Sequence, residues 1–307
     1  MTGPWRNAGV LLAPEQVPWA ASHVALPCTV PHGDHHRVFF SARDAQGRSH
    51  VGWCDADLVT GQVLAVCQAP VLGLGELGTF DDSGVTPSCV LEHAGRLYLY
   101  YTGWSLGQTV PFYFYVGLAV SEDGGASFRR VSRAPVFERT DTDPYLTASP
   151  CVRIEDGRWR AWYVSCLGWR TVDGEPRHDY AVRHAESVDG VHWARADGPC
   201  VAFQDAHEYA HGRPCVRRHE GRYEMFFAAR GEAYALAYAE SPDGLAWTRQ
   251  DAALAVPRGR WDAAMQAYPW LVETAAGPVM LYNGDGYGRT GIGRAVPGAP
   301  APTDDPA

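Results

Sequence analysis

The stretch SPCVRIEDGRWRAWYVS, residues 149–165, begins with a Ser-Pro pair, passes through an Asp-Gly turn and ends in a strand rich in aromatic residues. Two strand-like runs on either side of an Asp-Gly turn predict a β-hairpin. The same order of features returns elsewhere in the chain, so this stretch is one copy of a repeat. The repeat, rather than any single hairpin, determines the fold.

Four further stretches follow the same pattern. Each has a proline near its start, and successive prolines lie about 55 to 65 residues apart. The stretches are LPCTVPHGDHHRVFFSAR (26–43), TPSCVLEHAGRLYLYYTG (86–103), RPCVRRHEGRYEMFFAAR (213–230) and YPWLVETAAGPVMLYNG (268–284). Similarity at a period of this length is typical of repeat architectures such as propellers.

A second hairpin motif follows each of the three central copies. A strand of small residues enters an Asp-Gly turn and leaves on an aromatic residue in GLAVSEDGGASF (117–128), RHAESVDGVHW (183–193) and AYAESPDGLAW (237–247). Each unit thus encodes two hairpins, or about four strands, and no stretch has the sustained 3.6-residue period of a capped helix. We therefore predict an all-β protein, a five-bladed β-propeller with four-stranded antiparallel blades. The strand near residues 10–12 is expected to close the ring beside the fifth copy.

The sequence predicts one propeller domain over residues 1–297 and a disordered, Pro/Ala/Asp-rich tail over residues 298–307. The N-terminus lacks a basic n-region and a long apolar stretch, which argues against a signal peptide or a membrane span. Eight cysteines in such a chain are read as free thiols, so the cytoplasm is the expected location.

Charge and aromatic content narrow the class of partner. A net charge of −9 without a basic stripe argues against nucleic-acid binding. The 11 tryptophans and 15 tyrosines suit a surface that stacks on sugar rings. The expected partner is a small sugar, a glycoside or a sugar-containing metabolite, not a nucleic acid or a membrane.

Acidic residues precede four of the five repeat prolines. Because the innermost strands of a propeller surround its axis, the residues before these prolines are expected to converge. One acid at such a place is ordinary turn chemistry, but four at equivalent positions indicate a catalytic set of the kind that glycoside hydrolysis needs. The predicted catalytic residues are Asp82, Asp143, Glu208 and Asp262. The first copy has His23 in this window instead.

Substrate-binding residues are predicted from the same window and from the ends of the following strands. Arg43 and Arg230 end equivalent strands and could bind a carboxylate, hydroxyl or phosphate, with a structural salt bridge as an equal alternative. The predicted set is His23, Arg43, Asp81, Trp104, Trp169, His211, Arg230, Tyr268 and Asn283.

Two histidine-rich motifs do not predict a metal site. HEYAH (207–211) matches the zinc motif H-E-x-x-H only formally, because no helical pattern surrounds it. HGDHH (32–36) falls where the other copies have an exposed turn. No cofactor is predicted, and a cation bound in the channel stays an open alternative.

The repeat also resembles a known superfamily. Its Pro-x-Val strands, S-x-D-G-x-x-W hairpins and acids before the inner strands are similar to those of the five-bladed propeller glycosidases, which include arabinanases, β-xylosidases, invertases, levansucrases and mannoside phosphorylases. FDDSGVTPS, WDAAMQAYP and LYNGDGYGRTGIG resemble a bacterial branch linked to polysaccharide or sugar modification. The resemblance implies catalytic acids at Asp82, Asp143 and Glu208, supported by Asp262 and Arg43.

One departure leaves the reaction open. Arabinanase-type enzymes place a carboxylate before the first inner strand, where this chain has His23. The leading hypothesis is a carbohydrate-active enzyme that cleaves or transfers a glycosidic bond, with Asp82 as base or nucleophile and Glu208 as proton donor. The alternatives are a non-hydrolytic cyclase, epimerase, lyase or transferase of a polysaccharide or natural-product pathway, and a non-catalytic sugar-binding propeller.

Overall fold

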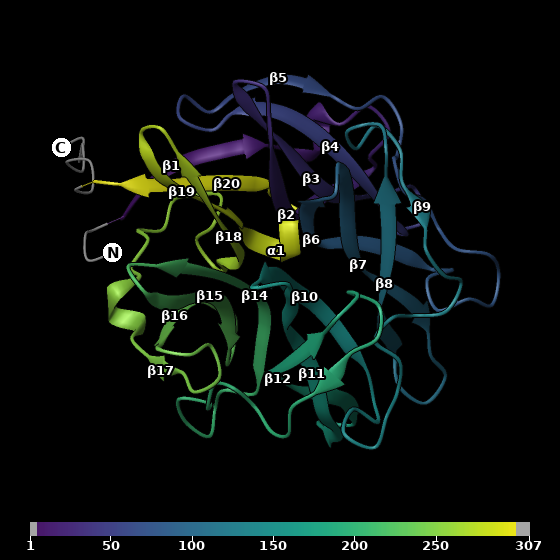
Figure 1. Cartoon of the computed structure of the whole chain (residues 1–307). Coiled ribbons are helices and arrows are strands. Elements are labelled where there is room, and N and C mark those ends of the chain that lie inside the picture. Colours follow the sequence, from purple (N-terminus) through teal and green to yellow (C-terminus); the bar gives the residue numbers. More distant parts are fainter. Residues whose placement is uncertain (1–4, 299–307) are drawn as a thin grey trace.

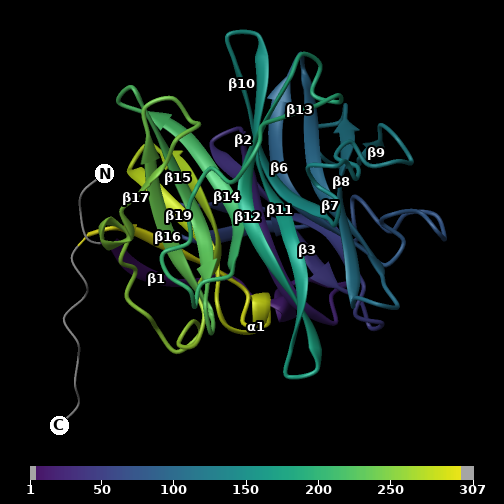
Figure 2. The same ribbon diagram turned by 90° about the horizontal axis from the view of Figure 1, so that it is seen from below.

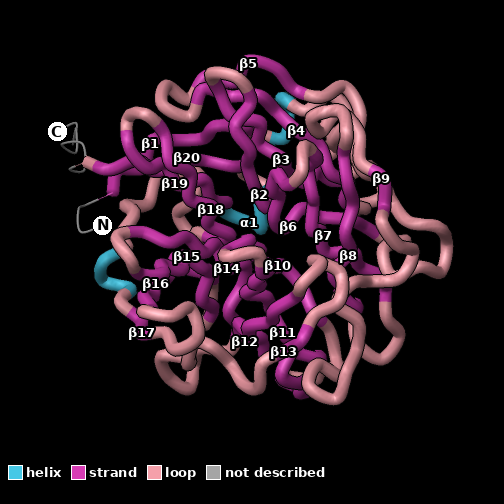
Figure 3. Tube along the Cα trace, viewed as in Figure 1, coloured by secondary structure: helices cyan, strands magenta, loops and turns pink. Residues whose placement is uncertain are grey.

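The computed structural model describes residues 5–298 (Figure 1). The predicted tail therefore lies, except for Gly298, outside the described residues. Strands dominate the described chain (Figure 3), which confirms the all-β class. Its helices are the short segments η1 (Pro14–Gln16), η2 (Asp251–Ala253) and α1 (Asp285–Gly288). None of them is long and apolar enough to cross a membrane.

The strands form three sheets. The four-stranded sheet has the order β1 (Trp5–Leu12), β20 (Ile292–Pro297), β19 (Gly277–Asn283) and β18 (Ala267–Thr274). One eight-stranded sheet contains β2 (Ser22–His32), β3 (His35–Arg43), β4 (Ser49–Asp57), β5 (Gln62–Val66), β6 (Gly84–His93), β7 (Arg96–Leu106), β8 (Phe112–Ser121) and β9 (Arg129–Arg130). The other contains β10 (Thr147–Glu155), β11 (Arg158–Val172), β12 (Glu175–Ser187), β13 (Ala194–Arg195), β14 (Ala210–His219), β15 (Arg222–Arg230), β16 (Tyr234–Ser241) and β17 (Thr248–Arg249).

Each eight-stranded sheet consists of two antiparallel halves joined by one parallel pairing. In the first sheet, Ser49 of β4 pairs with Gly84 of β6. In the second, Tyr180 of β12 pairs with Ala210 of β14. All other pairings within these sheets are antiparallel. A half-sheet is thus one repeat unit of the sequence.

The strands that carry the repeat prolines surround the centre of the molecule (Figure 1). Strand β2 contacts β6, β6 contacts β10, β10 contacts β14, β14 contacts β18, and β18 contacts β2, so the ring of inner strands is closed. At the outer edge of the last sheet, β1 pairs with β20. This pairing confirms that the N-terminal strand completes the fifth unit.

The Ser-x-Asp-Gly turns link neighbouring units. In one of them, Ser187 Oγ accepts a hydrogen bond from the amide of Gly190 at 2.9 Å, and Asp189 Oδ1 accepts one from the amide of Val191 at 2.8 Å. An aromatic residue of the preceding unit then binds the turn, because Tyr100 Oη donates to the carbonyl of Gly190 at 2.7 Å. Trp162 Nε1 donates to the carbonyl of Gly244 in the same way, also at 2.7 Å.

All eight cysteines are free thiols, as predicted. Three of them link adjacent inner strands, since their sulfur atoms accept hydrogen bonds from backbone amides of the next unit. Cys89 accepts from Val152 at 3.4 Å, Cys151 from Val216 at 3.2 Å, and Cys215 from Leu271 at 3.3 Å. Their recurrence after the prolines therefore reflects packing of the inner ring.

Candidate functional site

A backbone irregularity recurs where the inner strands begin. The antiparallel register shifts between Ala25 and Cys28, Ala148 and Cys151, Gly212 and Cys215, and Ala267 and Trp270. The residue before the proline in each of these bulges has a left-handed backbone, with φ of 58° at Leu26, 47° at Ser149, 49° at Arg213 and 58° at Tyr268. Such φ values are uncommon for residues other than glycine and are strained.

These bulges direct their residues into one central pocket of about 390 Å³. Leu26, Ser149, Arg213 and Tyr268 all line it, and so does Thr86, which precedes the remaining repeat proline. In that copy the register shifts one step later, between Pro87 and Cys89. The volume falls in the range of small-molecule sites. The pocket lies at the end of the ring where the inner strands begin, since the residues before the repeat prolines line it. At the end of the molecule where α1 lies, the β11–β12 hairpin extends beyond the other strands (Figure 2).

The described lining of the pocket contains cations, phenols and aromatic rings but no carboxylate. The charged and titratable residues of the lining are His23, Arg43, His178, Tyr180, Arg213, Arg230, Tyr234, Tyr268 and Tyr287. Trp104, Phe112 and Phe114 add an aromatic wall, and Ser41, Ser49, Thr86, Thr102 and Ser149 add hydroxyl groups.

Arg213 is among the residues that line the pocket, although only 1% of its surface is exposed. Its Nη2 donates to the carbonyls of Pro27 and Ser88 at 2.6 and 3.1 Å. Its Nε and Nη1 have no hydrogen-bond partner in residues 5–298. Burial lowers the pKa of Arg213, since a charged group in the interior loses its hydration.

Arg230 lies among aromatic rings. Its guanidinium is 5.4 Å from the ring centroids of Tyr209 and Tyr234 and 5.8 Å from that of Tyr287. These distances are those of cation–π contacts, which hold the guanidinium without neutralising it. Within the described chain, neither Arg230 nor Arg43 forms an ion pair with a carboxylate. The alternative role considered for these two arginines, a structural salt bridge, is therefore wrong for the described chain.

The histidines of the pocket are neutral at pH 7. Burial and the positive charges of Arg43 and Arg289 lower the pKa of His23 to about 4. Burial and Arg230 lower the pKa of His178 to about 4 as well. Burial raises the pKa values of Tyr180 and Tyr268 far above that of free tyrosine, so their phenols keep their protons. Only the arginines bring charge to the pocket.

The predicted acids lie elsewhere, and this corrects the expectation that they share one channel. Asp81 accepts hydrogen bonds from Tyr101 Oη at 3.0 Å and from Arg130 Nε at 2.7 Å. Asp143 accepts from Tyr163 Oη at 2.8 Å and from Arg195 Nη1 at 2.9 Å. These carboxylates are 1% and 0% exposed. We call such a buried acid and its partners an acid clasp.

Two further acid clasps complete the series. Asp262, also 0% exposed, accepts from Tyr282 Oη at 2.8 Å and from Asn7 Nδ2 at 3.1 Å. Glu208 accepts from Arg249 Nη1 at 2.6 and 2.8 Å and pairs with His211 Nε2 at 2.5 Å. Burial alone would raise the pKa of Glu208, but its bonds to His211, the amide of Gln204 and Arg249 outweigh it and lower the pKa.

The clasps explain why acids recur at equivalent positions. In each of these four units the acid precedes the inner strand and binds a residue of the outermost strand, which is Arg130 of β9, Arg195 of β13, Arg249 of β17 or Asn7 of β1. Asp143, Glu208 and Asp262 are equivalent, as the repeat predicts, and the equivalent acid of the second unit is Asp81. The physical reason for their recurrence is that a buried carboxylate needs hydrogen-bond partners nearby. None of Asp82, Asp143, Glu208 and Asp262 lines the pocket. The catalytic role of these acids stays a prediction.

The roles of the two adjacent aspartates also differ from the expectation. Asp81 is the clasp residue equivalent to Asp143. Asp82 belongs to a surface turn, where its Oδ2 accepts from the amide of Gly78 at 3.0 Å and its Oδ1 from Ser83 Oγ at 2.8 Å. The acid expected to carry the chemistry thus has turn partners, and the one expected in a turn is buried.

The predicted substrate-binding residues divide into two groups. His23, Arg43, Trp104, Arg230 and Tyr268 line the pocket. The others do not: Asp81 and His211 belong to clasps, Trp169 lies behind the wall with its ring 5.5 Å from Phe112, and Asn283 joins β19 to β2 by accepting from the amide of Leu26 at 2.8 Å.

Sequence reasoning missed part of the lining. Arg213 and Ser149 had a readable signal, since each directly precedes a repeat proline. His178 and Tyr180 on β12, and Phe112 and Phe114 on β8, had none, because they belong to strands whose length and approach to the pocket do not follow from the repeat.

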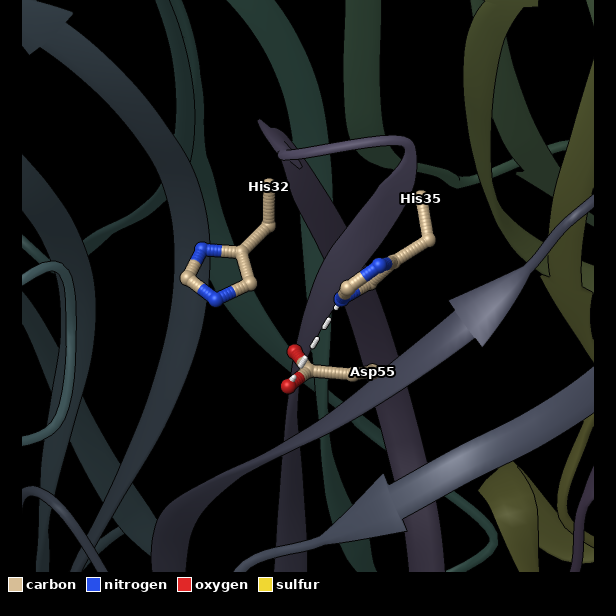
Figure 4. A group of neighbouring side chains, drawn as sticks. All are labelled: His32, His35 and Asp55. Carbon is tan, nitrogen blue, oxygen red and sulfur yellow. Dashed lines mark ion pairs between the residues drawn. The ribbon is translucent and has the colours of Figure 1, made fainter.

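The motif HGDHH contributes to a small cluster away from the pocket (Figure 4). Possible ligand atoms of His32, His35 and Asp55 lie within 4.8 Å of one another. However, Arg37 donates to both oxygens of Asp55 at 2.8 Å and lies 3.3 Å from His32 Nε2. The guanidinium already neutralises the carboxylate, so the cluster is explained without a metal. HEYAH runs from a turn at His207 into the first residues of β14, Ala210 and His211, and contains no helix.

Comparison with solved structures finds the same fold in several proteins that are described as glycoside hydrolases. A structure of a complex of BT0996 and RGII has a TM-score of 0.76 at 17% identity, covering 100% of this chain and 95% of the other. A structure described as a glycoside hydrolase has a TM-score of 0.75 at 16% identity, with 100% and 95% coverage. A structure reported for GH130, a family of mannoside phosphorylases and β-1,2-mannosidic glycoside hydrolases, has a TM-score of 0.74 at 16% identity, with 98% and 97% coverage. At these identities the likeness shows the fold.

The chain belongs to the family of two proteins of Mycobacterium tuberculosis. It is 41% identical over 299 residues to uncharacterized protein MT1551 of strain CDC 1551 / Oshkosh, covering 95% of this chain and 98% of the relative. It is 40% identical over 299 residues to uncharacterized protein Rv1502 of strain H37Rv, with the same coverage. No protein-family model matches the chain.

Proposed function

We propose that the protein is a carbohydrate-active enzyme whose substrate binds in the central pocket. The observation that carries the proposal is the strained bulge before the inner-strand prolines, which brings side chains from distant parts of the chain to one cavity of about 390 Å³. Strain of this kind persists where a site requires it. The glycoside hydrolases among the solved structures with this fold support the substrate class.

We also propose that the three sheets correspond to the five blades of a β-propeller. The closed ring of β2, β6, β10, β14 and β18 supports it. So do the single parallel pairings, Ser49 with Gly84 and Tyr180 with Ala210, which divide each eight-stranded sheet into two units. On this reading the pocket occupies the axis of a propeller, where every blade contributes to the site.

The composition of the pocket favours a non-hydrolytic step over hydrolysis by two carboxylates. Glycoside hydrolysis ordinarily needs two carboxyl groups that flank the scissile bond. The described lining offers imidazoles, phenols and guanidiniums instead. His23 and His178 are the candidate proton acceptors, and the protonated phenol of Tyr268 is a candidate donor. Cyclisation, epimerisation, elimination and group transfer need acid–base groups of this kind.

The experiment compares pocket variants with acid variants on one panel of glycosides and activated sugars, followed by mass spectrometry. His23→Asn, chosen because asparagine tolerates the left-handed backbone, and Tyr268→Phe are expected to lower turnover at least 100-fold. Asp82→Asn and Glu208→Gln test the carboxylate hypothesis. Loss of turnover in these two acid variants, with full turnover in both pocket variants, would overturn the proposal. Chromophore release from aryl glycosides would favour hydrolysis.

A further inference from the structure

We propose that the pocket selects a sugar that carries a negatively charged group, a carboxylate or a phosphate, and that Arg43 and Arg230 bind this group above the buried charge of Arg213. The inference rests on the proposed function for the sugar part of the ligand. The charge requirement has its own evidence.

The first evidence is an uncompensated positive charge. Three guanidiniums line the pocket, although the whole chain has a net charge of −9. Within residues 5–298 none of the three has an ion-pair partner, because the nearby acids are committed to their clasps. A buried cation without a counter-charge is costly. An anionic ligand would supply the missing charge.

The second evidence is the free hydrogen-bonding capacity of these arginines. Nε and Nη1 of Arg213 and Nε of Arg230 are buried without a partner in the described chain. Buried polar atoms are nearly always satisfied, so each such atom requires an explanation. Arg213 is 1% exposed and acts mainly through its field. Arg230 is half-buried and Arg43 is exposed, so a ligand can reach both guanidiniums.

The third evidence is the placement of the two accessible arginines on equivalent strands. Arg43 ends β3 and Arg230 ends β15, equivalent strands of two different repeat units. Contact with the tyrosine rings restricts the rotamers of Arg230, and a held guanidinium can give a planar anion two parallel hydrogen bonds. The aromatic wall of Trp104, Phe112 and Phe114 then suits the apolar face of the sugar ring.

Binding of an anion here would also change the state of His23. The positive charges of Arg43 and Arg289 are part of the reason that the pKa of His23 is low; burial is the larger cause, and a bond with the backbone of Gly286 acts in the opposite direction. A negative charge beside Arg43 offsets the part of this pKa decrease that the arginine charges cause. The pKa of His23 is therefore expected to rise when the charged ligand binds, which makes the imidazole a better base only in the presence of the correct substrate.

The experiment measures binding by titration calorimetry at low salt. The probes are glucuronate, galacturonate, glucose 6-phosphate, inorganic phosphate and neutral glucose. At least one anionic sugar is expected to bind ten-fold or more tightly than glucose, and 0.5 M salt is expected to weaken it, because part of the affinity is electrostatic. The uronates and the sugar phosphate distinguish the two sources of charge.

Arg43→Gln and Arg230→Gln are each expected to reduce affinity for the anionic sugar at least ten-fold while leaving the weak binding of glucose unchanged. Arg222→Gln is the matched control, since this arginine is 71% exposed and pairs with Glu240 on the outer surface. Unchanged circular dichroism and melting temperature show that the variants are folded. In the wild type, an NMR titration is expected to show a higher pKa for the His23 ring when the anion is saturating.

The outcomes separate this inference from the proposed function. Equal affinity for glucose and the anionic sugars, or unchanged affinity in both arginine variants, overturns the charge requirement and leaves the sugar pocket standing. Inorganic phosphate that binds as tightly as glucose 6-phosphate supports the anion site and contradicts the sugar part of the ligand. Absence of binding by every anion overturns the inference.

Discussion

Four of the five residues that precede a repeat proline combine backbone strain with a place in the lining of the pocket. These four residues have positive φ, and their side chains are as different as leucine, serine, arginine and tyrosine. A left-handed backbone costs an L-residue about 1–2 kcal/mol, so the strain is repeated around the ring. The four residues have in common that the bulge places each of them in the lining of the pocket. Proline then fixes the start of the regular inner strand.

Ser149 provides a test of this strain, because its side chain is small. Ser149→Gly removes the Cβ atom that disfavours φ of 47°, whereas Ser149→Ala keeps it. Ser149→Gly is expected to have a free energy of unfolding about 1 kcal/mol higher than that of Ser149→Ala. Urea unfolding of the two variants measures the difference. A less stable glycine variant would mean that the bulge is not strained at this residue.

At the scale of elements, the acid clasps hold the outermost strand of four units in place. Strands β9, β13 and β17 are only two residues long and have few ladder hydrogen bonds of their own. Each carries an arginine that binds the acid preceding the inner strand of the same unit. The clasp therefore connects the inner and outer edges of a unit, and β1 uses Asn7 for the same purpose.

Asp143 and Asp82 form a matched pair for testing the clasps. Asp143→Asn removes the charge that compensates Arg195 and Arg183 in the interior and is expected to lower the free energy of unfolding by about 3 kcal/mol. Asp82→Asn, the same chemical change in a surface turn, is expected to cost less than about 1 kcal/mol. Thermal and urea unfolding measure both. A fully stable but inactive Asp143→Asn protein would instead support the catalytic role expected from the sequence.

At the scale of the whole molecule, the repeat made the ring predictable and left the site only partly so. The innermost strands can be predicted from the sequence, because the repeat period and the turn residues are local features. The period is visible in the spacing of Pro27, Pro87, Pro150, Pro214 and Pro269. The direction of a side chain beside a bulge cannot be predicted in this way, since a shift of one residue in register reverses that direction. Arg213 shows the consequence, since it lies inside a bulge directly before Pro214 and lines the pocket. Asp143 lies outside the bulge of its unit, before Ala148, and binds Arg195 of the same unit.

The pairing of β1 with β20, which completes the last unit from the other end of the chain, leads to the last prediction. Leu12 is 0% exposed and Val10 is 41% exposed, on the same strand at the edge of the sheet that contains both ends of the described chain. Leu12→Ala is expected to lower the free energy of unfolding by about 3 kcal/mol, and Val10→Ala by less than about 1 kcal/mol. Because the closed ring makes each unit depend on both neighbours, we expect Leu12→Ala to shift a single transition, with far-ultraviolet circular dichroism and tryptophan fluorescence coinciding. Two separate transitions would mean that the terminal sheet unfolds alone and that β1 is not what holds the ring together.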